Sequence, residues 1–208
     1  MRTAKTVLTV IQERGKQKKP IERVYKLLFN RELYLNAYAK LYPNNGAMTK
    51  GVTDETVDGM SIQKIDRMIE ILREEKYQWK PARREYIKKK NGKKRPLGIP
   101  VWGDKVLQEV MRQILEAYYE PQFSEHSHGF RPNRGCHTAL QEIQVWKGTR
   151  WFIEGDISQY FDTIDHKILL EILARNIHDG RFIRLVSNML EAGYLEEWKF
   201  NQTISGVP

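Results

Sequence analysis

The residue of this chain whose type and setting best suit a chemical role is an aspartate, Asp156. It follows the strand-forming residues 151–153, and the dipeptide Gly155-Asp156 is a poor strand former, so packing alone does not explain it. The pattern predicts a buried strand that delivers one carboxylate to its end. A carboxylate presented in this way can bind Mg²⁺, but strand-end aspartates also serve as caps or surface groups. The elements around Asp156 therefore have to distinguish a metal-binding role from that of a cap or a surface group.

The elements after Asp156 suit a site of this kind. Asp162 and Asp165 favour a turn and the start of a helix over residues 166–176. A second helix is predicted over residues 180–192, and the alternating residues 197–203 predict a strand. A strand, a carboxylate, a turn and a helix then follow one another, which would hold the carboxylate in place.

Charge is concentrated in two blocks of the chain. Its 208 residues, enough for one domain or two small ones, carry a net charge of +9. Residues 1–31 carry a net +7 and residues 73–95 a net +8, so the rest is slightly acidic. Such blocks indicate a polyanionic partner, RNA or DNA ahead of a membrane. Solubilising charge is the alternative interpretation.

Several classes of protein are excluded by composition. There is no run of 18 apolar residues, and the basic N-terminus lacks the apolar core of a secretory signal. The single cysteine, Cys136, forbids an internal disulfide and fits a reducing compartment, so we expect a cytoplasmic protein, with an organellar one as the alternative. A zinc site near Cys136 is disfavoured because paired cysteines are absent, and a nucleophilic role because no partner base is evident.

The N-terminal part of the chain is predicted to be helical. Residues 1–20 favour a short helix followed by a mobile basic arm, and residues 21–41 a helical stretch that Asn30 divides in two. A polar, glycine-bearing loop is expected over residues 46–60. Ser61 is a plausible N-cap for the amphipathic helix that follows.

The second basic block predicts a β-hairpin. Asn91-Gly92 is a strong hairpin signal between strands near residues 84–88 and 95–100, and lysines crowd its tip and flanks. Helices are expected over residues 104–119 and 136–146. The loop between them, residues 127–135, is rich in side chains that contact phosphate or stack on bases.

These segments, in this order, resemble the conserved blocks of reverse transcriptases encoded by group II introns. The resemblance covers about residues 20–208, and details within it are similar to the branch related to mitochondrial intron proteins. The matching blocks are the loop 46–60, the basic hairpin with Arg95-Pro96-Leu97-Gly98-Ile99-Pro100, Ser127-His128-Gly129-Phe130-Arg131-Pro132, Glu154-Gly155-Asp156 through Asp162, and Ser205-Gly206-Val207-Pro208.

The resemblance implies an α+β fold of the right-hand polymerase type. It implies mostly helical fingers with a basic β-hairpin, and the first part of the palm. The implied divisions are a basic N-terminal arm (1–20), an N-terminal extension with helical fingers (21–80), fingers with the hairpin (81–150) and the start of the palm (151–208).

Particular residues acquire roles from the resemblance. Asp156 would be the catalytic, Mg²⁺-binding carboxylate, with the backbone oxygen of Ile157 as a further ligand. Lys89 and Arg95 would touch the incoming dNTP, and Phe161 would pack beneath its sugar, with core packing as the alternative. The implied partners are group II intron RNA, an RNA template, a DNA primer and dNTP, and a homodimer is compatible with the sequence. The expected RNA contacts are Lys16, Lys18, Lys19, Arg83, Arg84, Arg131 and Arg134.

The expected function is therefore that of an RNA-directed DNA polymerase and intron maturase. The resemblance also implies further metal-binding carboxylates after Pro208, so we expect these 208 residues alone to bind RNA without polymerising. The alternatives are another bacterial reverse transcriptase, of the retron or diversity-generating type, and an RNA-binding module without catalysis. The loop 46–60 and the basic N-terminal arm favour the intron class.

Overall fold

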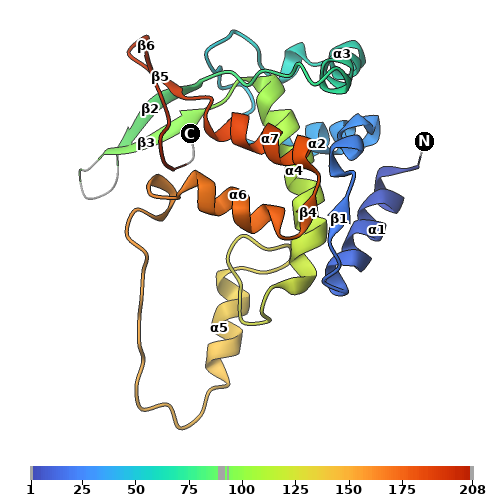
Figure 1. The fold of residues 1–208 in the computed structure, drawn as a ribbon. Coiled ribbons are helices and arrows are strands. Elements are labelled where there is room, and N and C mark those ends of the chain that lie inside the picture. Colours follow the sequence, from blue (N-terminus) through green and yellow to red (C-terminus); the bar gives the residue numbers. More distant parts are fainter. Residues whose placement is uncertain (1, 89–91, 93, 207–208) are drawn as a thin grey trace.

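A long central helix organises the protein, which is known from a computed structural model describing residues 2–88, 92 and 94–206. Helix α4 carries the buried residues Val106, Val110, Ile114 and Tyr118 along one stripe, as the predicted helix over residues 104–119 requires. Figure 1 shows the other helices of the body gathered around it. The helices of the body, with α4 included, are α1 (Ala4–Lys16), α2 (Arg31–Leu41), α3 (Ile62–Arg73), α4 (Trp102–Tyr119) and α7 (Gly180–Leu190).

The helix boundaries of the N-terminal part follow the capping residues in the sequence. Asn30 separates the 3-10 helix η1 (Val24–Phe29) from α2 and caps α2, because its side chain accepts a hydrogen bond from Glu32 N. Ser61 caps α3 in the same way through Lys64 N. Both predictions are confirmed.

The basic N-terminal segment forms the predicted short helix, α1. The residues after this helix are held against α4, so the prediction that they form a mobile arm is wrong. Gly15 lies on the backbone of Tyr118, where an added Cβ would be 2.1 Å from the Tyr118 carbonyl oxygen. The Tyr118 hydroxyl donates to the carbonyl of Lys19 at 3.0 Å. The close crossing of α1 with α4 and the hydrogen bond to Lys19 therefore hold the segment against the body. Both are contacts between residues far apart in the sequence, so local patterns do not predict them.

The structure contains two small sheets. Strands β1 (Ile21–Glu22) and β4 (Ile177–His178) pair in parallel, and a four-stranded sheet has the order β3-β2-β5-β6. Its strands are β2 (Ala82–Lys88), β3 (Lys94–Ile99), β5 (Tyr194–Glu196) and β6 (Lys199–Asn201). The predicted hairpin is confirmed as β2 and β3, which are antiparallel with Ile87 opposite Arg95. The strand predicted over residues 197–203 is present as the shorter β6, and the range differs because Glu197 and Trp198 form the turn between β5 and β6.

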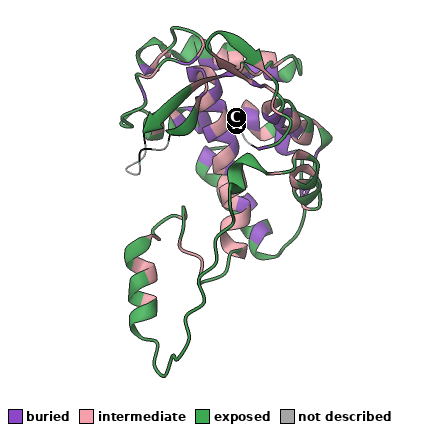
Figure 2. Ribbon diagram, turned by 90° about the vertical axis from the view of Figure 1, so that its left-hand side faces the viewer, coloured by how far each residue is buried: buried purple, intermediate pink, exposed green. Residues whose placement is uncertain are grey.

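Residues 136–165, which we call the extension, lie largely outside the packed body, as Figure 2 shows. Helix α5 (Cys136–Gln144) forms as predicted, but residues 151–157 form no strand and are exposed. The predicted buried strand is therefore wrong for this structure, because no strand of the described residues lies beside it to pair. After the 3-10 turn η4 (Tyr160–Asp162), helix α6 (His166–Ala174) rejoins the body through Leu169, Leu170 and Leu173.

Two further 3-10 helices are η2 (Val57–Gly59), in the loop 46–60, and η3 (Glu120–Gln122), which follows directly after α4. None of the helices in the described ranges is long and apolar enough to cross a membrane. The observed fold is mixed helix and sheet, in agreement with the α+β prediction.

Candidate functional site

Asp156 and Ile157 lie in the exposed part of the extension. Both side chains reach solvent, with Ile157 67% exposed. Carboxylate and carbonyl oxygens are hard ligands, so the donor types suit Mg²⁺. Within the described part of the chain, however, no group of three or more His, Cys, Asp or Glu side chains is placed to hold a metal ion. These two residues therefore offer part of a ligand set.

The turn that contains Phe161 is joined to the C-terminal segment. The amide of Gly206 donates to the carbonyl of Ile164 at 2.9 Å, and the carbonyl of Gly206 lies 2.6 Å from His166 Nε2. A Cβ on Gly206 would lie 2.7 Å from the carbonyl oxygen of Phe161, and its φ is +79°, so only glycine fits. Two blocks about forty residues apart in sequence are thus brought together.

Phe161 itself is not part of the core. Its ring is 55% exposed and packs edge-on against Tyr160, with 5.3 Å between ring centroids. The core-packing alternative is therefore wrong here, and the predicted contact with a nucleotide sugar stays a prediction.

The basic hairpin presents its cations at the edge of the four-stranded sheet. Arg95 is exposed on β3, opposite Ile87 on β2. Lys89 lies outside the described residues. The dNTP contact stays a prediction for both residues.

Arg83 and Lys105 hold the loop 46–60 in place. Two guanidinium nitrogens of Arg83 donate to the carbonyl of Lys50 at 3.0 and 2.9 Å. Lys105 donates to the carbonyl of Thr49 at 3.0 Å. Burial, together with the nearby charge of Arg83, lowers the pKa of Lys105. Arg83 thus holds this loop, and its predicted contact with RNA stays a prediction. Lys105 was missed because no pattern in the sequence links it to the loop 46–60.

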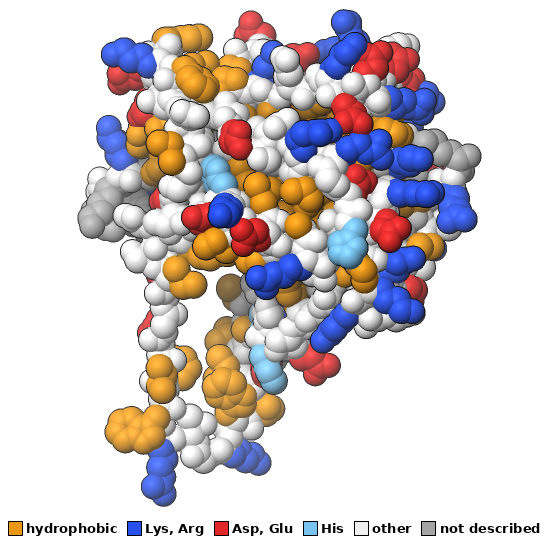
Figure 3. All heavy atoms as spheres, in the orientation of Figure 1, with side chains coloured by type: hydrophobic (Ala, Val, Ile, Leu, Met, Phe, Trp, Pro, Cys, Tyr) orange, Lys and Arg blue, Asp and Glu red, His pale blue; other side chains and the backbone are white. Residues whose placement is uncertain are grey.

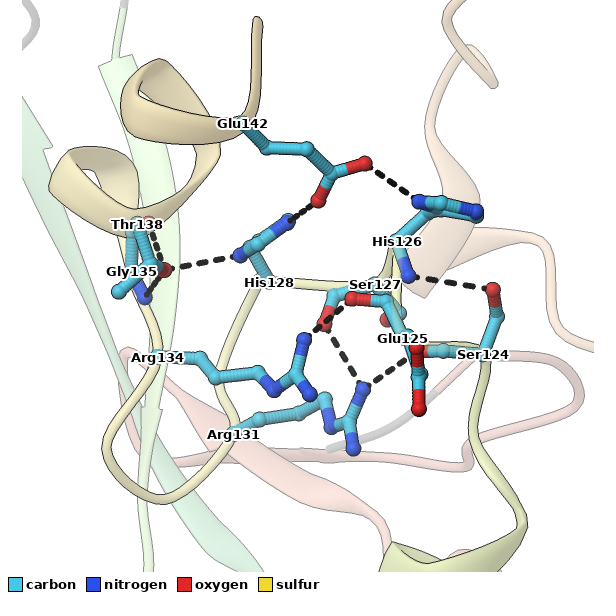
Figure 4. A network of polar contacts seen from close by, with 10 residues as sticks. All are labelled: Ser124, Glu125, His126, Ser127, His128, Arg131, Arg134, Gly135, Thr138 and Glu142. Atoms are coloured by element: carbon cyan, nitrogen blue, oxygen red, sulfur yellow. Dashed lines mark hydrogen bonds and ion pairs between the residues drawn. The ribbon is translucent and has the colours of Figure 1, made fainter. Parts of the chain in front are cut away.

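The loop after α4 is held by two further cations that were predicted to bind RNA, as Figure 4 shows in part. Arg131 pairs with Glu120 at 2.9 Å and donates to the carbonyls of Ser124 and Ser127 at 2.6 and 2.8 Å. Its side chain is only 8% exposed. Arg134 donates to the carbonyl of Glu125. Arg131 is thus buried and holds the loop, and its contact with RNA stays a prediction.

A histidine–carboxylate cluster fastens α5 to the same loop (Figure 4). His128 lies 2.7 Å from Glu142 through Nε2 and 2.8 Å from the hydroxyl of Thr138 through Nδ1. His126 contacts the other oxygen of Glu142. Hydrogen bonds from His128, and then from His126, lower the pKa of Glu142. The sequence showed these histidines, but only the i, i+4 spacing of Thr138 and Glu142 pointed to their partners.

The N-terminal cations remain largely available at the surface. Lys16 pairs with Glu13 at 2.7 Å, an exposed pair worth little. Lys18 and Lys19 are exposed, although the backbone of Lys19 is held by Tyr118. Figure 3 shows Lys and Arg side chains gathered on the right of this face, where α1 and β1 lie in Figure 1. The contact of these residues with RNA stays a prediction.

An apolar groove of about 970 Å³ runs beside α4. It lies between α4, α7 and the loop after α4, and its lining includes Leu115, Tyr119, Met189 and Phe130. Phe130 is fully exposed and has a positive φ of 56°. The groove and the exposed extension both leave apolar surface open to solvent.

Comparison with known proteins assigns these features to a family. The family model described as "Reverse transcriptase (RNA-dependent DNA polymerase)" matches residues 87–207, which include most of the basic hairpin and the joined blocks at Phe161 and Gly206.

Relatives of the chain include intron-encoded proteins. It is 50% identical over 188 residues to "Group II intron-encoded protein LtrA" of Lactococcus lactis, covering 89% of this chain and 31% of LtrA. It is 46% identical over 213 residues to the "Uncharacterized 91 kDa protein in cob intron" of Schizosaccharomyces pombe, covering 99% of this chain and 26% of that protein. The "Putative COX1/OXI3 intron 1 protein" of Saccharomyces cerevisiae is 39% identical over 184 residues, covering 88% and 22%. The chain thus spans less than a third of these relatives, and the predicted resemblance to group II and mitochondrial intron proteins is confirmed.

Proposed function

The chain belongs to the reverse transcriptase family, and from this we propose that the protein is an RNA-directed DNA polymerase that also acts as a group II intron maturase. It would copy an RNA template from a DNA primer with dNTP, and bind intron RNA to assist splicing. The observation that carries the proposal is the family match over residues 87–207, joined with the identity to intron-encoded relatives.

Residue roles follow from the chemistry of phosphoryl transfer. The reaction requires in-line positioning and cations on the triphosphate. We assign the metal-binding carboxylate to Asp156, with the Ile157 carbonyl beside it; bound Mg²⁺ would neutralise phosphate charge. Lys89 and Arg95 would hold the triphosphate, since arginine suits bidentate and lysine point contacts. Phe161 would pack beneath the sugar and leave no room for a 2′-hydroxyl.

The proposed domain organisation places these residues in two parts of a right hand. The arm (1–20), the helical fingers (21–80) and the fingers with the hairpin (81–150) would bind RNA and dNTP. Residues 151–208 would begin the palm. The support is the order of the conserved blocks along the chain.

Primer extension tests the polymerase proposal in the protein as its source organism makes it. On an RNA template with a DNA primer, wild-type protein should incorporate dNTP, and Asp156→Asn should abolish incorporation. Glu171→Gln, which changes an exposed acid on α6, is the matched control and should leave the rate unchanged. Normal extension by Asp156→Asn would contradict the assignment.

Substitution of the two hairpin cations tests the dNTP contacts. Lys89→Ala and Arg95→Ala each remove one charge-assisted contact, typically worth about 1.5–3 kcal/mol. We expect weaker dNTP use, about ten- to a hundredfold in kcat/KM, with RNA binding mostly kept. Loss of RNA binding with unchanged dNTP kinetics would make the hairpin an RNA clamp instead.

The second candidate function, RNA binding without catalysis, is favoured for the 208 residues taken alone. Two metal ions need more than one carboxylate, and the described residues gather no metal-binding group. The 208-residue chain should bind single-stranded RNA with a logarithmic salt slope of about −0.7 per phosphate contacted. Affinity that does not change with salt would contradict RNA binding, and dNTP incorporation abolished by Asp156→Ala would contradict inactivity.

A further inference from the structure

The turn between β5 and β6 has an unfavourable backbone for its residues. Glu196 pairs with Lys199, so Glu197 and Trp198 alone form the turn, and both have positive φ, 49° and 64°. A two-residue hairpin turn of this kind favours Asn-Gly, because most side chains are strained at positive φ. Strain held at a surface turn points to a function for the residues that it displays.

The side chain that this turn displays is a large aromatic one. Trp198 is 89% exposed, although burial would stabilise an indole of this size. Figure 1 places the turn at the end of the four-stranded sheet, beside the β2–β3 hairpin and away from the extension. Next to it is a hollow of about 340 Å³, lined in part by Arg83, Arg84, Tyr86 and Trp198. That volume falls in the range of small-ligand sites.

Arg84 supplies a cation at the edge of this hollow. Its guanidinium lies over the ring of Tyr194, 3.4 Å from the ring centroid. Its Nε is buried and has no hydrogen-bond partner among the described residues. The ring of Tyr194 therefore fixes the position of this cation beside the hollow.

The carboxylates at the hollow are mostly engaged by neighbouring side chains. Glu85 pairs with Arg83, and Glu196 accepts a hydrogen bond from the Tyr86 hydroxyl. Glu197 belongs to the turn itself. The hollow therefore combines an exposed aromatic face with the side chains of two arginines, Arg83 and Arg84.

We propose that this hollow holds one nucleotide of single-stranded RNA, with its base stacked on Trp198 beside the cations that line the hollow. Exposed aromatic faces beside cations are how proteins bind unpaired bases. The inference rests on the proposed function only in that the protein binds RNA, and it adds a binding site that the predicted contacts did not include.

Binding of a labelled single-stranded RNA tests the site. Trp198→Ala should weaken binding about tenfold, the value of one lost stacked base, with the salt slope unchanged because no phosphate contact is lost. Trp151→Ala is the matched control, since Trp151 is 87% exposed but lies in the extension, and it should change affinity less than twofold. Equal affinity of Trp198→Ala and wild type would overturn the inference alone. A wild-type chain that binds no RNA would overturn the proposed function.

A second variant separates binding from a structural role of the turn. Glu197→Asn combined with Trp198→Gly gives the turn its preferred residues, so thermal stability should rise while RNA affinity falls. A fall in both would show that Trp198 serves the fold instead. Unlabelled mononucleotide should not compete with the RNA at equal nucleotide concentration. Equal competition would mean that the site takes free nucleotides, which would overturn the assignment to RNA.

Discussion

The helical body and the extension have similarly apolar sequences but different environments. In the body, α4 buries a complete stripe against neighbouring helices that include α1 and α2, and Val106, Val110, Ile114 and Tyr118 are fully buried. In the extension, residues 136–165, no side chain is buried, and Trp151, Phe152 and Ile153 are 71–93% exposed. Apolar pattern therefore predicts burial only where the chain also supplies a partner surface, as it does for helices that pack on neighbouring helices.

The largest difference between the two regions should appear on truncation of an isoleucine. Ile114→Ala leaves a cavity in the centre of the body and should lower the free energy of unfolding by about 4 kcal/mol. Ile153→Ala removes an exposed side chain and should change it by less than about 0.5 kcal/mol. Urea unfolding followed by circular dichroism measures both. Equal losses would mean that the extension is packed like the body.

A matched pair of glycines gives the next effect. Gly15→Ala would place a Cβ 2.1 Å from the Tyr118 carbonyl and should cost about 3 kcal/mol by forcing α1 from α4. Gly155→Ala meets no atom within 4 Å, so its effect should be small. Thermal unfolding of both variants checks this. A tolerated Gly15→Ala would show that α1 does not pack on α4.

The loop that joins the body to the extension should give a smaller effect. Arg131→Ala leaves Glu120 and two carbonyls without their donor and should cost about 2 kcal/mol. Arg134→Ala removes one bond to a carbonyl and should cost about 0.5 kcal/mol. Chemical denaturation distinguishes them. Reduced RNA affinity of Arg131→Ala with unchanged stability would support its predicted contact with RNA and contradict its role in holding the loop.

The smallest expected effect concerns the attachment of α5 and depends on pH. Because its histidine partners lower the pKa of Glu142, its contribution is present above the ordinary value of about 4.5 and is lost as the pH falls below it. Amide exchange in α5, corrected for its intrinsic pH dependence, should therefore accelerate in acid. Glu142→Gln should have the same effect at neutral pH. Protection that is unchanged in both conditions would mean that other contacts hold α5.

Much of the fold was predictable because its signals are local. Helical periodicity predicted α3 and α4, and Ser61 and Asn30 marked where helices begin. The Asn91-Gly92 signal predicted the β2–β3 hairpin. The strand predicted at residues 151–157 does not form in the structure, since a strand depends on a neighbouring strand that local sequence does not specify. The β5–β6 turn was missed because Glu197 and Trp198 lack the residues that such a turn favours.

The site was less predictable than the fold. The sequence shows that a residue is a cation but does not show whether it meets phosphate, a carboxylate or a carbonyl. Arg83 and Arg131 were both predicted to bind RNA. In the structure Arg83 donates to the carbonyl of Lys50, and Arg131 forms an ion pair with Glu120. Phe161 and Gly206 were expected in separate blocks, and only the folded chain joins them.

Parallel primer-extension and splicing assays on the Asp156→Asn protein, in the form made by its source organism, test the central claim most directly. The substitution keeps the side-chain size and removes the charge that would bind a metal, while the proposed RNA-binding surface is untouched. We predict that DNA synthesis is abolished and that splicing of the intron RNA is retained. Splicing that is lost while circular dichroism shows an intact fold would contradict the separation of a metal-binding carboxylate from an RNA-binding surface.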